Sequence, residues 1–477
     1  MTGGMFIDIA AVRIGDYLSR TPDLKGRRGA SAWLSHASHR AGLPDWLATA
    51  TAPLHHRPEV NQEAGEADGL IPLRIPAGPA GDSRSDGGAE DVARTVVDAL
   101  RRRLPGVWLR ANWATADSYL EAYRAMREPG AGAGLEAFPP LPDLPVLATC
   151  ARCRVDPAVA AIDIHEEGNV PVCADCEARY ADRYRRPGLW HEHVPVGAET
   201  DLLEALSLTP RQVVQHFTEL AALGAEDGCR NHLATVHIDG NGLGALFDHI
   251  ARYGDRDLKA RVSARVSAAT RVALVEATRT VLDSSRTVPV IPHLVGGDDV
   301  LVSVVADRAW RFVTTYLEAF ADRMRGVDGL AEHLPDGQRV TGSAGMVFAH
   351  ATFPFRRSAE LAEGALKTAK QEHQGRDAAV GWLDVTRDGE QQPRHRATWT
   401  TRALADLGPA LAALAAVPPS GRAVCARLID PDRPGLSAAR LREQARRLDR
   451  GDVLDPFLTH GGPAAVADAL SLVRWWR

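Results

Sequence analysis

The sequence predicts an α+β protein of several domains, in which a four-cysteine module lies between two α+β halves and a helical region follows. Its 477 residues exceed the length of one ordinary domain. Two Cys-x-x-Cys pairs separate the halves, and short apolar segments alternate with helical patterns after them. From about Trp399 the chain is rich in Ala, Leu and Arg, which is typical of helices.

The composition is that of a folded globular protein. Hydrophobic residues make up 45% of the chain and charged residues 25%, which excludes wholesale disorder and fibrous repeats. The net charge of -5 gives no global basic field, so any nucleic-acid contact must use a local patch. The chain has no apolar run of about 18 residues and no signal-peptide pattern. We therefore expect a cytoplasmic protein without a membrane partner.

The first half is predicted to be α+β, with few polar groups that indicate chemistry. Residues 76–90 are rich in Gly, Pro, Ser and Asp and are predicted to form a surface loop. Residues 128–145 are rich in Gly and Pro and are predicted to form a linker. Strands are expected at 5–11 and 106–111, and helices at 22–39, 91–104 and 115–126.

The second half shows a clearer alternation of strands and helices. Two apolar strands are separated only by Gly-Gly-Asp-Asp at 296–299, which predicts a hairpin with a tight turn. The order of elements is strand, helix, hairpin, helix, strand, helix, strand, which is that of a nucleotidyl-transfer palm. Strands are expected at 233–238, 288–295, 300–305, 338–349 and 378–385, and helices from 246 through 257–283, at 308–325 and at 355–372.

Four cysteines have the spacing of a zinc site. Cys150 and Cys153 form one pair, and Cys173 and Cys176 form the other. Two such knuckles can converge tetrahedrally on Zn²⁺, and a site with four thiolates has no open position, so we expect a structural zinc. The alternatives are two unrelated thiol pairs or a catalytic redox dithiol.

Two acidic motifs stand at the ends of predicted strands. Asp239 follows the first palm strand, and Asp298 lies at the hairpin tip. Neighbouring strand ends would bring both carboxylates close enough to hold two divalent cations, Mg²⁺ or Mn²⁺. Such a pair would activate a ribose 3′-hydroxyl and stabilise a pyrophosphate leaving group. The alternative is an ordinary Asp-Gly turn and a polar hairpin tip.

The turn after Asp239 is rich in glycine. Gly240, Gly242 and Gly244 would let the backbone and the following helix N-terminus approach a triphosphate. Lysine is rare in this chain, and Lys367 and Lys370 lie one helical turn apart on the helix predicted at 355–372. They could place an ammonium over phosphates, or they could belong to a solvated helix face.

These motifs together resemble the large palm-domain subunit of type III CRISPR effector complexes, also called the CRISPR polymerase. The resemblance rests on the 239–244 turn, the 296–299 turn and the cysteine pairs upstream. It extends to Ser-Ala-Gly-Met-Val-Phe from Ser343 and to residues 359–370, and at the N-terminus to 7–12 and 24–34. The resemblance does not include the His-Asp nuclease domain of many family members, so we do not expect this chain to cleave DNA.

The resemblance implies two ferredoxin-like palm domains, the zinc module between them and a helical C-terminal domain. The resemblance implies that Asp239, Asp298 and Asp299 bind the metal ions or hold the residues that bind them. It also implies that Lys370 contacts the triphosphate. Family members often have Asp where this chain has Asn241. The candidate nucleotide-binding residues are Gly240, Asn241, Gly242, Leu243, Gly244, Gly296, Gly297 and Lys370. The expected domains are a non-catalytic first palm at 1–127, the linker at 128–145, the zinc module at 146–200, the second palm at 201–395 and the helical domain at 396–477.

The resemblance also implies a function: synthesis of cyclic oligoadenylates from ATP as an antiviral second messenger. The implied partners are ATP or another ribonucleotide, guide or target RNA and small CRISPR effector subunits, with a homo-oligomer also possible. Two alternatives stay open at this stage. One is a non-catalytic scaffold of an RNA-guided complex, and the other is a diguanylate cyclase of the GGDEF class, which shares the palm.

Overall fold

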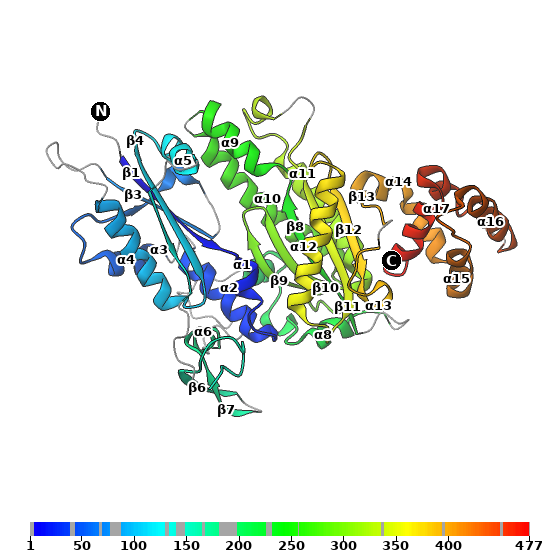
Figure 1. Ribbon diagram of the computed structural model, residues 1–477, viewed down its shortest axis with the longest axis horizontal. Helices are drawn as coiled ribbons and strands as arrows, with labels where there is room; N and C mark the ends of the chain where they lie inside the picture. Colours follow the sequence, from blue (N-terminus) through cyan, green and yellow to red (C-terminus); the bar gives the residue numbers. More distant parts are fainter. Residues whose placement is uncertain are drawn as a thin grey trace.

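A computed structural model shows two β-sheets side by side, a small cysteine module below the first and a group of helices beyond the second (Figure 1). The helices α15 (Pro419–Arg427) and α16 (Pro434–Arg447) lie farthest from the first sheet, and the C-terminal end of the chain returns to the second sheet. The structure describes residues 4–38, 43–65, 69–76, 87–128, 133–139, 148–164, 167–180, 198–225, 231–255, 257–334, 338–393, 396–448 and 452–476.

The first sheet is antiparallel throughout and has the strand order β2-β3-β1-β4-β5. On its central strand Met5, Ile7 and Ile9 face a core made with the helices that follow. Its strands are β1 (Gly4–Val12), β2 (Glu59–Val60), β3 (Leu70–Ile75), β4 (Trp108–Ala116) and β5 (Ala133–Ala137). Its helices are α1 (Ile14–Leu18), α2 (Leu24–Ser38), α3 (Leu43–Thr51), η1 (Gln62–Ala64), α4 (Gly87–Arg103) and α5 (Tyr119–Arg127).

Two predictions for this region are wrong in part. Strand β5 lies inside the segment that the sequence predicted as a linker, and it pairs with β4 from Leu109↔Ala137 to Trp113↔Ala133. The strand is held by backbone hydrogen bonds to β4 and by Leu135 and Ala137, which pack against the core of the first sheet. Residues 87–90 of the predicted loop belong to helix α4. Residues 129–132 and 140–145 of the linker segment, and residues 77–86 of the loop, lie outside the described residues.

The second sheet has the order β13-β12-β11-β8-β10-β9, with only β11 and β12 parallel. Its strands are β8 (His232–Gly240), β9 (Val290–Gly296), β10 (Asp299–Val305), β11 (Gly342–His350), β12 (Ala379–Asp384) and β13 (Trp399–Thr400). Around it lie α7 (Ala198–Ala205), η3 (Pro210–Gln212), α8 (Phe217–Ala222), α9 (Leu243–Tyr253), α10 (Leu258–Val281), η4 (Ala306–Arg308), α11 (Ala309–Met324), η5 (Ala331–His333), α12 (Phe355–Glu372) and α13 (Val385–Asp388).

Both sheets have the ferredoxin-like order of a palm. Numbered along the chain, the four main strands lie in the order 2-3-1-4 as β2-β3-β1-β4 in the first sheet and β9-β10-β8-β11 in the second. Helices connect the first strand to the second and the third to the fourth in each case. The predicted pair of palms is therefore confirmed as a fold, and we call the two regions the first and second palm.

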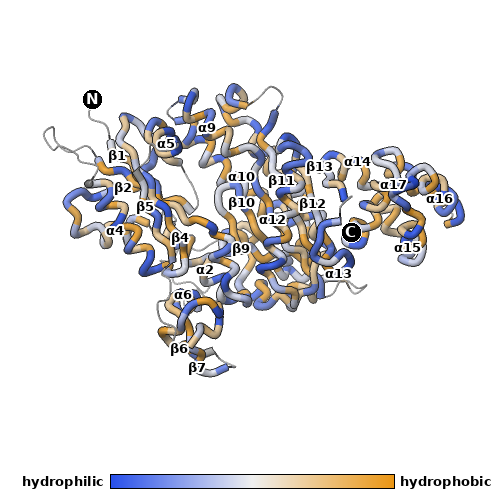
Figure 2. Tube along the Cα trace, in the orientation of Figure 1, coloured by the Kyte–Doolittle hydropathy of each residue, from blue (hydrophilic) through white to orange (hydrophobic). Residues whose placement is uncertain are grey.

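Helices cover both faces of the second sheet. Ala234, Val236 and Ile238 of β8 face the core that includes α10 and α11. The other face packs against α12, and there the approach is so close that a Cβ on Gly345 would lie 2.0 Å from the carbonyl oxygen of Ala362. Apolar segments run along the strands and the inner sides of these helices (Figure 2).

The cysteine module consists of the hairpin β6 (Ala160–Ile164) and β7 (Gly168–Val172), followed by helix α6 (Ala174–Arg179). Helix α6 packs on α2 of the first palm. Arg179 is fully buried there and donates hydrogen bonds to Asp175 (2.7 Å) and to the carbonyl of Tyr17 (2.7 Å). The module is therefore joined to the first palm by a buried contact.

Four helices follow the second palm: α14 (Thr401–Ala415), α15 (Pro419–Arg427), α16 (Pro434–Arg447) and α17 (Asp455–Leu472). After α17 the chain returns to the palm, where Trp475 donates a hydrogen bond of 2.9 Å to the buried carboxylate of Asp384. The predicted helical region is thus confirmed. Among the described residues no single helix is long and apolar enough to cross a membrane, although α14 and α15, bent by 113°, meet the length and composition criteria as a pair.

Candidate active site and cysteine centre

Strand β8 presents its polar side chains on the face that α12 covers. Side chains alternate along a strand, so Ala234, Val236 and Ile238 enter the core while His237 and Asp239 point to the opposite face. The sequence placed Asp239 directly after the strand, whereas β8 extends to Gly240 and contains it.

The hairpin tip meets the end of β8, as the sequence predicted. Asp299 of β10 pairs with Gly296 of β9, which leaves a two-residue turn of Gly297 and Asp298. The carboxylate of Asp298 accepts a hydrogen bond of 3.1 Å from the backbone N–H of Gly240. A Cβ on Gly240 would lie 2.6 Å from that carboxylate, so the close approach requires glycine.

Asp298 and Asp239 are electrostatically coupled. Burial and the nearby charge of Asp239 raise the pKa of Asp298 to about 7. Two carboxylates that share a partly buried site resist ionising together, and a cation between them relieves the repulsion. The oxygen-rich donor set therefore fits a divalent cation.

Lys370 reaches the same point from α12. Its ammonium forms an ion pair with Asp239 and donates a hydrogen bond of 2.7 Å to the carbonyl of Gly240. Lys367 instead pairs with Glu363 (2.6 Å) on the exposed side of the helix. The structure thus separates the two lysines, and only Lys370 lies at the strand ends.

His237 is a site residue that the sequence analysis did not single out. Its Nε2 lies 2.7 Å from Oδ1 of Asp299, so the second aspartate of the turn contacts a histidine. Burial lowers the pKa of His237, but the hydrogen bond and charge of Asp299 outweigh burial and raise it. The sequence could have identified His237 by its position two residues before Asp239, which places both side chains on the same face of the strand.

The other residues of the turn that were predicted to bind nucleotide differ in burial and in their contacts. Gly242, with a φ of 68°, precedes helix α9, and Gly244 lies in its first turn. The Leu243 side chain is buried in the core, which leaves only its backbone for a ligand. The amide of Asn241 is also buried, and it donates to Oγ1 of Thr341 (2.9 Å) and to the carbonyl of Asp377 (3.0 Å).

A cavity of about 210 Å³ lies between the two palms beside this site. The first palm lines it with Arg28 and Ser31 of α2, and the second palm with Arg271 of α10, His293 of β9 and Asp299. Asp299 therefore borders the cavity, while Asp298 faces Asp239. Sequence patterns could not predict this cavity, because its walls come from segments far apart in the chain.

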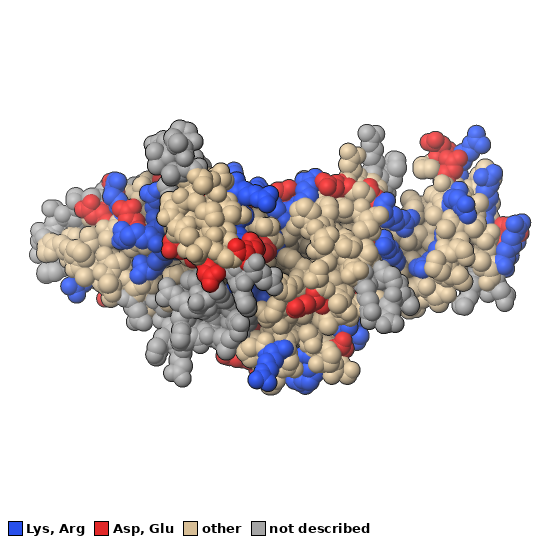
Figure 3. All heavy atoms as spheres, turned by 90° about the horizontal axis from the view of Figure 1, so that it is seen from below, with Lys and Arg blue, Asp and Glu red and all other residues tan. Residues whose placement is uncertain are grey.

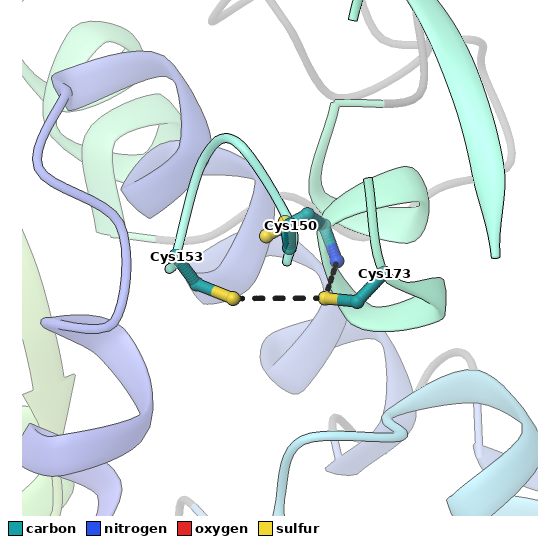
Figure 4. A group of neighbouring side chains, drawn as sticks. Cys150, Cys153 and Cys173 are labelled. Atoms are coloured by element: carbon teal, nitrogen blue, oxygen red, sulfur yellow. Dashed lines mark hydrogen bonds between the residues drawn. The ribbon is translucent and has the colours of Figure 1, made fainter. Parts of the chain in front are cut away.

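The four predicted zinc ligands converge. Cys150, Cys153, Cys173 and Cys176 are buried, and their sulfur atoms all lie within 4.8 Å of one another. Figure 4 shows Cys150, Cys153 and Cys173 gathered together, with Sγ of Cys153 and of Cys173 3.8 Å apart. Hydrogen bonds from the neighbouring thiols lower the pKa of Cys150. A buried cluster of four thiols fits a tetrahedral soft metal such as zinc.

Surface charge agrees with the near-neutral balance of the sequence. On the face shown in Figure 3, basic and acidic side chains are interspersed over both palms. Many basic side chains on the described helices are paired, for example Arg356 with Glu360 (3.1 Å) and Arg323 with Glu276 (2.5 Å). Such pairs are typical of a solvated surface.

Comparisons with known proteins identify the second palm. Residues 232–380 match the sequence family described as Cas10/Cmr2, second palm domain. A search of curated proteins found no match. Among solved structures the chain resembles a Csm1-Csm4 cassette in complex with cA4 (TM-score 0.58, 14% identity, 99% of this chain and 70% of that chain). It also resembles Csm1 of T. onnurineus (TM-score 0.57, 14% identity, 100% and 70%) and a cassette in complex with AMPPNP (0.55, 15%, 99% and 70%).

These matches confirm the resemblance that the motifs predicted. Residues 232–380 are of the Cas10/Cmr2 second-palm type, and the fold of the whole chain is similar to that of Csm1. The match covers both strand ends that bear the acidic residues, because Asp239, Asp298 and Asp299 lie within 232–380.

Proposed function

We propose that this chain is a nucleotidyltransferase that joins ribonucleotides, ATP above all, into 3′–5′ linked cyclic oligoadenylates for antiviral defence. The observation on which this rests is the convergence of Asp239, Asp298 and Lys370 at adjacent strand ends of a Cas10-type palm. Csm1-Csm4 cassettes of similar fold are known in complex with cA4, cA3 and AMPPNP, which supports a nucleotide substrate.

The proposed metal ligands are Asp239 and Asp298, which would hold two Mg²⁺ or Mn²⁺ ions, with Asp299 in close support. Bound cations would supply the positive charge that activates a ribose 3′-hydroxyl and stabilises the pyrophosphate leaving group. The raised pKa of Asp298 supports this assignment, because a carboxylate crowded by another is a common feature of functional sites.

Lys370 and the glycine-rich turn would orient the triphosphate. The Lys370 ammonium already holds Asp239 and the Gly240 carbonyl, so it fixes the turn and places a compact positive charge beside it. Helix α9 starts after Gly242 without a side-chain cap, so its first backbone N–H groups would be available to a phosphate. Gly296 and Gly297 keep the hairpin tip narrow on the other side.

The cavity between the palms is the proposed place for a second, acceptor nucleotide. The first palm would be non-catalytic and would form one wall of this cavity through Arg28 and Ser31. Activity should therefore depend on an ordered pair of palms. The predicted domain boundaries at 127, 145, 200 and 395 would separate the first palm, the linker, the zinc module, the second palm and the helical domain. These boundaries stay predictions.

The cysteine cluster is proposed to bind one structural Zn²⁺, which would hold α6 against the first palm. The proposed partners are small CRISPR effector subunits and guide or target RNA, as the Csm1-Csm4 cassettes of similar fold support for a protein partner. Association of two copies of the chain and a cytoplasmic location also stay predictions.

The test is to incubate the full-length protein with each ribonucleotide and Mg²⁺ or Mn²⁺, with and without RNA and partner subunits, and to resolve products by mass. We expect pyrophosphate and cyclic adenylates from ATP. The double variant Asp298→Ala with Asp299→Ala should make none and stay folded, while Asp98→Ala, on an exposed position of α4, should match the wild type. No pyrophosphate from any nucleotide would favour the scaffold function. A product made from GTP alone would favour a diguanylate cyclase.

A further inference from the structure

We infer that Asn241 is a positioning residue: it fastens the glycine-rich turn to the second sheet and offers its side chain to neither metal nor nucleotide. The family resemblance draws attention to this position because Asp is frequent there. The effect of Asn241 on catalysis rests on the proposed function, but its effect on the turn does not.

Three hydrogen bonds fasten Asn241. Its backbone N–H donates to the carbonyl of Thr341 (2.8 Å), and its side-chain amide donates both to Oγ1 of Thr341 (2.9 Å) and to the carbonyl of Asp377 (3.0 Å). The residue is only 5% exposed. All its N–H groups are therefore directed at the segment before β11 and the segment before β12, away from the Asp298 carboxylate.

The fastened residue is next to the groups that form the site. Gly240 donates its N–H to Asp298 and accepts the ammonium of Lys370 through its carbonyl (2.7 Å). Asp239 precedes it on the same strand. A displacement at Asn241 would therefore move the backbone that sets the distance between the two carboxylates.

An aspartate cannot make the same contacts. Asn has two side-chain N–H groups, and ionised Asp has none, so the carbonyl of Asp377 would face a negative oxygen in place of a donor. The Oδ1 atom of Asn241 is buried without a hydrogen-bond partner, and a charge at that position would be unpaired as well. In this chain an Asp at position 241 would loosen the turn and would not restore a metal ligand.

The experiment compares Asn241→Asp, Asn241→Ala and Thr341→Val in the full chain. The matched control is Asn169→Asp, which makes the same change of charge at an exposed position of β7. Amide hydrogen exchange over residues 238–246 reports the turn directly. Calorimetry with Mn²⁺ alone reports the carboxylate pair, and product formation from ATP separates kcat from KM.

We expect exchange in this segment to become roughly tenfold faster in both Asn241 variants, less so in Thr341→Val, and to stay unchanged in the control. Affinity for Mn²⁺ and kcat should fall about tenfold in Asn241→Asp, with KM for ATP less affected. If Asn241→Asp does not fold, Thr341→Val still reports the same anchor.

Unchanged exchange in Asn241→Asp and Thr341→Val, or an Asn241→Asp variant that binds Mn²⁺ more tightly and makes more product, would overturn the inference. A wild-type protein that makes no product contradicts the proposed function alone. The exchange measurement would then still decide whether Asn241 fastens the turn.

Discussion

The two palms share a strand order but use corresponding faces of their central strands differently. In the second palm, the face of β8 that α12 covers carries His237 and Asp239. Asp239 is only half-buried there, beside Lys370. In the first palm the face of β1 away from the main core holds Asp8, which is enclosed beneath Tyr119 of α5 and accepts its hydroxyl hydrogen bond (2.8 Å). The carboxylate of the central strand is therefore enclosed in the first palm, and in the second palm it is partly exposed at the strand end, where we propose the active site.

A side chain of the second palm also packs into the first palm. Lys259 of α10 lies 4.8 Å from the ring centre of Tyr119 and 4.3 Å from that of Tyr123, both on α5. It donates to the carbonyl of Ala64 at 3.4 Å, and burial lowers its pKa to about 8. The space beside Asp8 in the first palm is thus filled by a side chain of the second palm.

The largest expected difference is catalytic. Asp239→Asn should lower product formation by about a thousandfold, because the variant removes a proposed metal ligand and the ion pair of Lys370. Asp8→Asn is the matched change in the first palm and should retain activity within about threefold. Rates of pyrophosphate release measure both. Equal losses in the two variants would show that both palms contribute chemistry.

The next largest expected effect is on zinc content and stability, and it concerns the cysteine module that packs on the first palm. Cys173→Ser should lose zinc and destabilise the protein by roughly 3–4 kcal/mol, because metal binding stabilises the fold directly. Cys425→Ser changes a buried cysteine of the helical region and should keep zinc. Elemental analysis and thermal unfolding test this. Full stability in zinc-free Cys173→Ser would contradict a structural metal.

A smaller effect should appear in the pH dependence of stability. Burial raises the pKa of Asp8 to about 6 from its ordinary value of 3.8. The folded protein therefore holds this proton more tightly than the unfolded chain, so the contribution of Asp8 is greatest below pH 4 and falls as the pH rises to about 6. Its full size is on the order of 3 kcal/mol.

Asp8→Asn removes this titration, since Asn stays neutral. The free energy of unfolding of the variant minus that of the wild type should therefore increase as the pH rises from 4 to 7. Urea unfolding at several pH values measures the difference. A constant difference across that range would show that Asp8 does not titrate in the folded protein.

The smallest effect compares two of the rare lysines. Lys259→Met should destabilise the protein by about 1–2 kcal/mol at pH 7.5, because it leaves the ionised Asp8 without its nearest positive charge. Lys367→Met, on the exposed side of α12, should change stability by no more than about 0.5 kcal/mol. Chemical unfolding measures both, and equal effects would mean that the contact between the palms contributes little.

The sequence by itself determined the elements and motifs that depend on local pattern. The apolar segment 233–238 predicted most of strand β8, Gly-Gly-Asp-Asp at 296–299 predicted a tight hairpin turn, and paired cysteines predicted their own cluster. These predictions succeed because a single strand, turn or cysteine pair is determined by residues only a few positions apart.

Only the tertiary structure decided which groups meet across the chain. Lys370 reaches Asp239 and Asn241 reaches Asp377 over more than a hundred residues, and Lys259 enters the first palm from the second. Strand β5 likewise exists because β4 offers it a partner. Periodicity reports which side of an element is apolar, but the partner of a buried polar group depends on how elements pack, which no local pattern encodes.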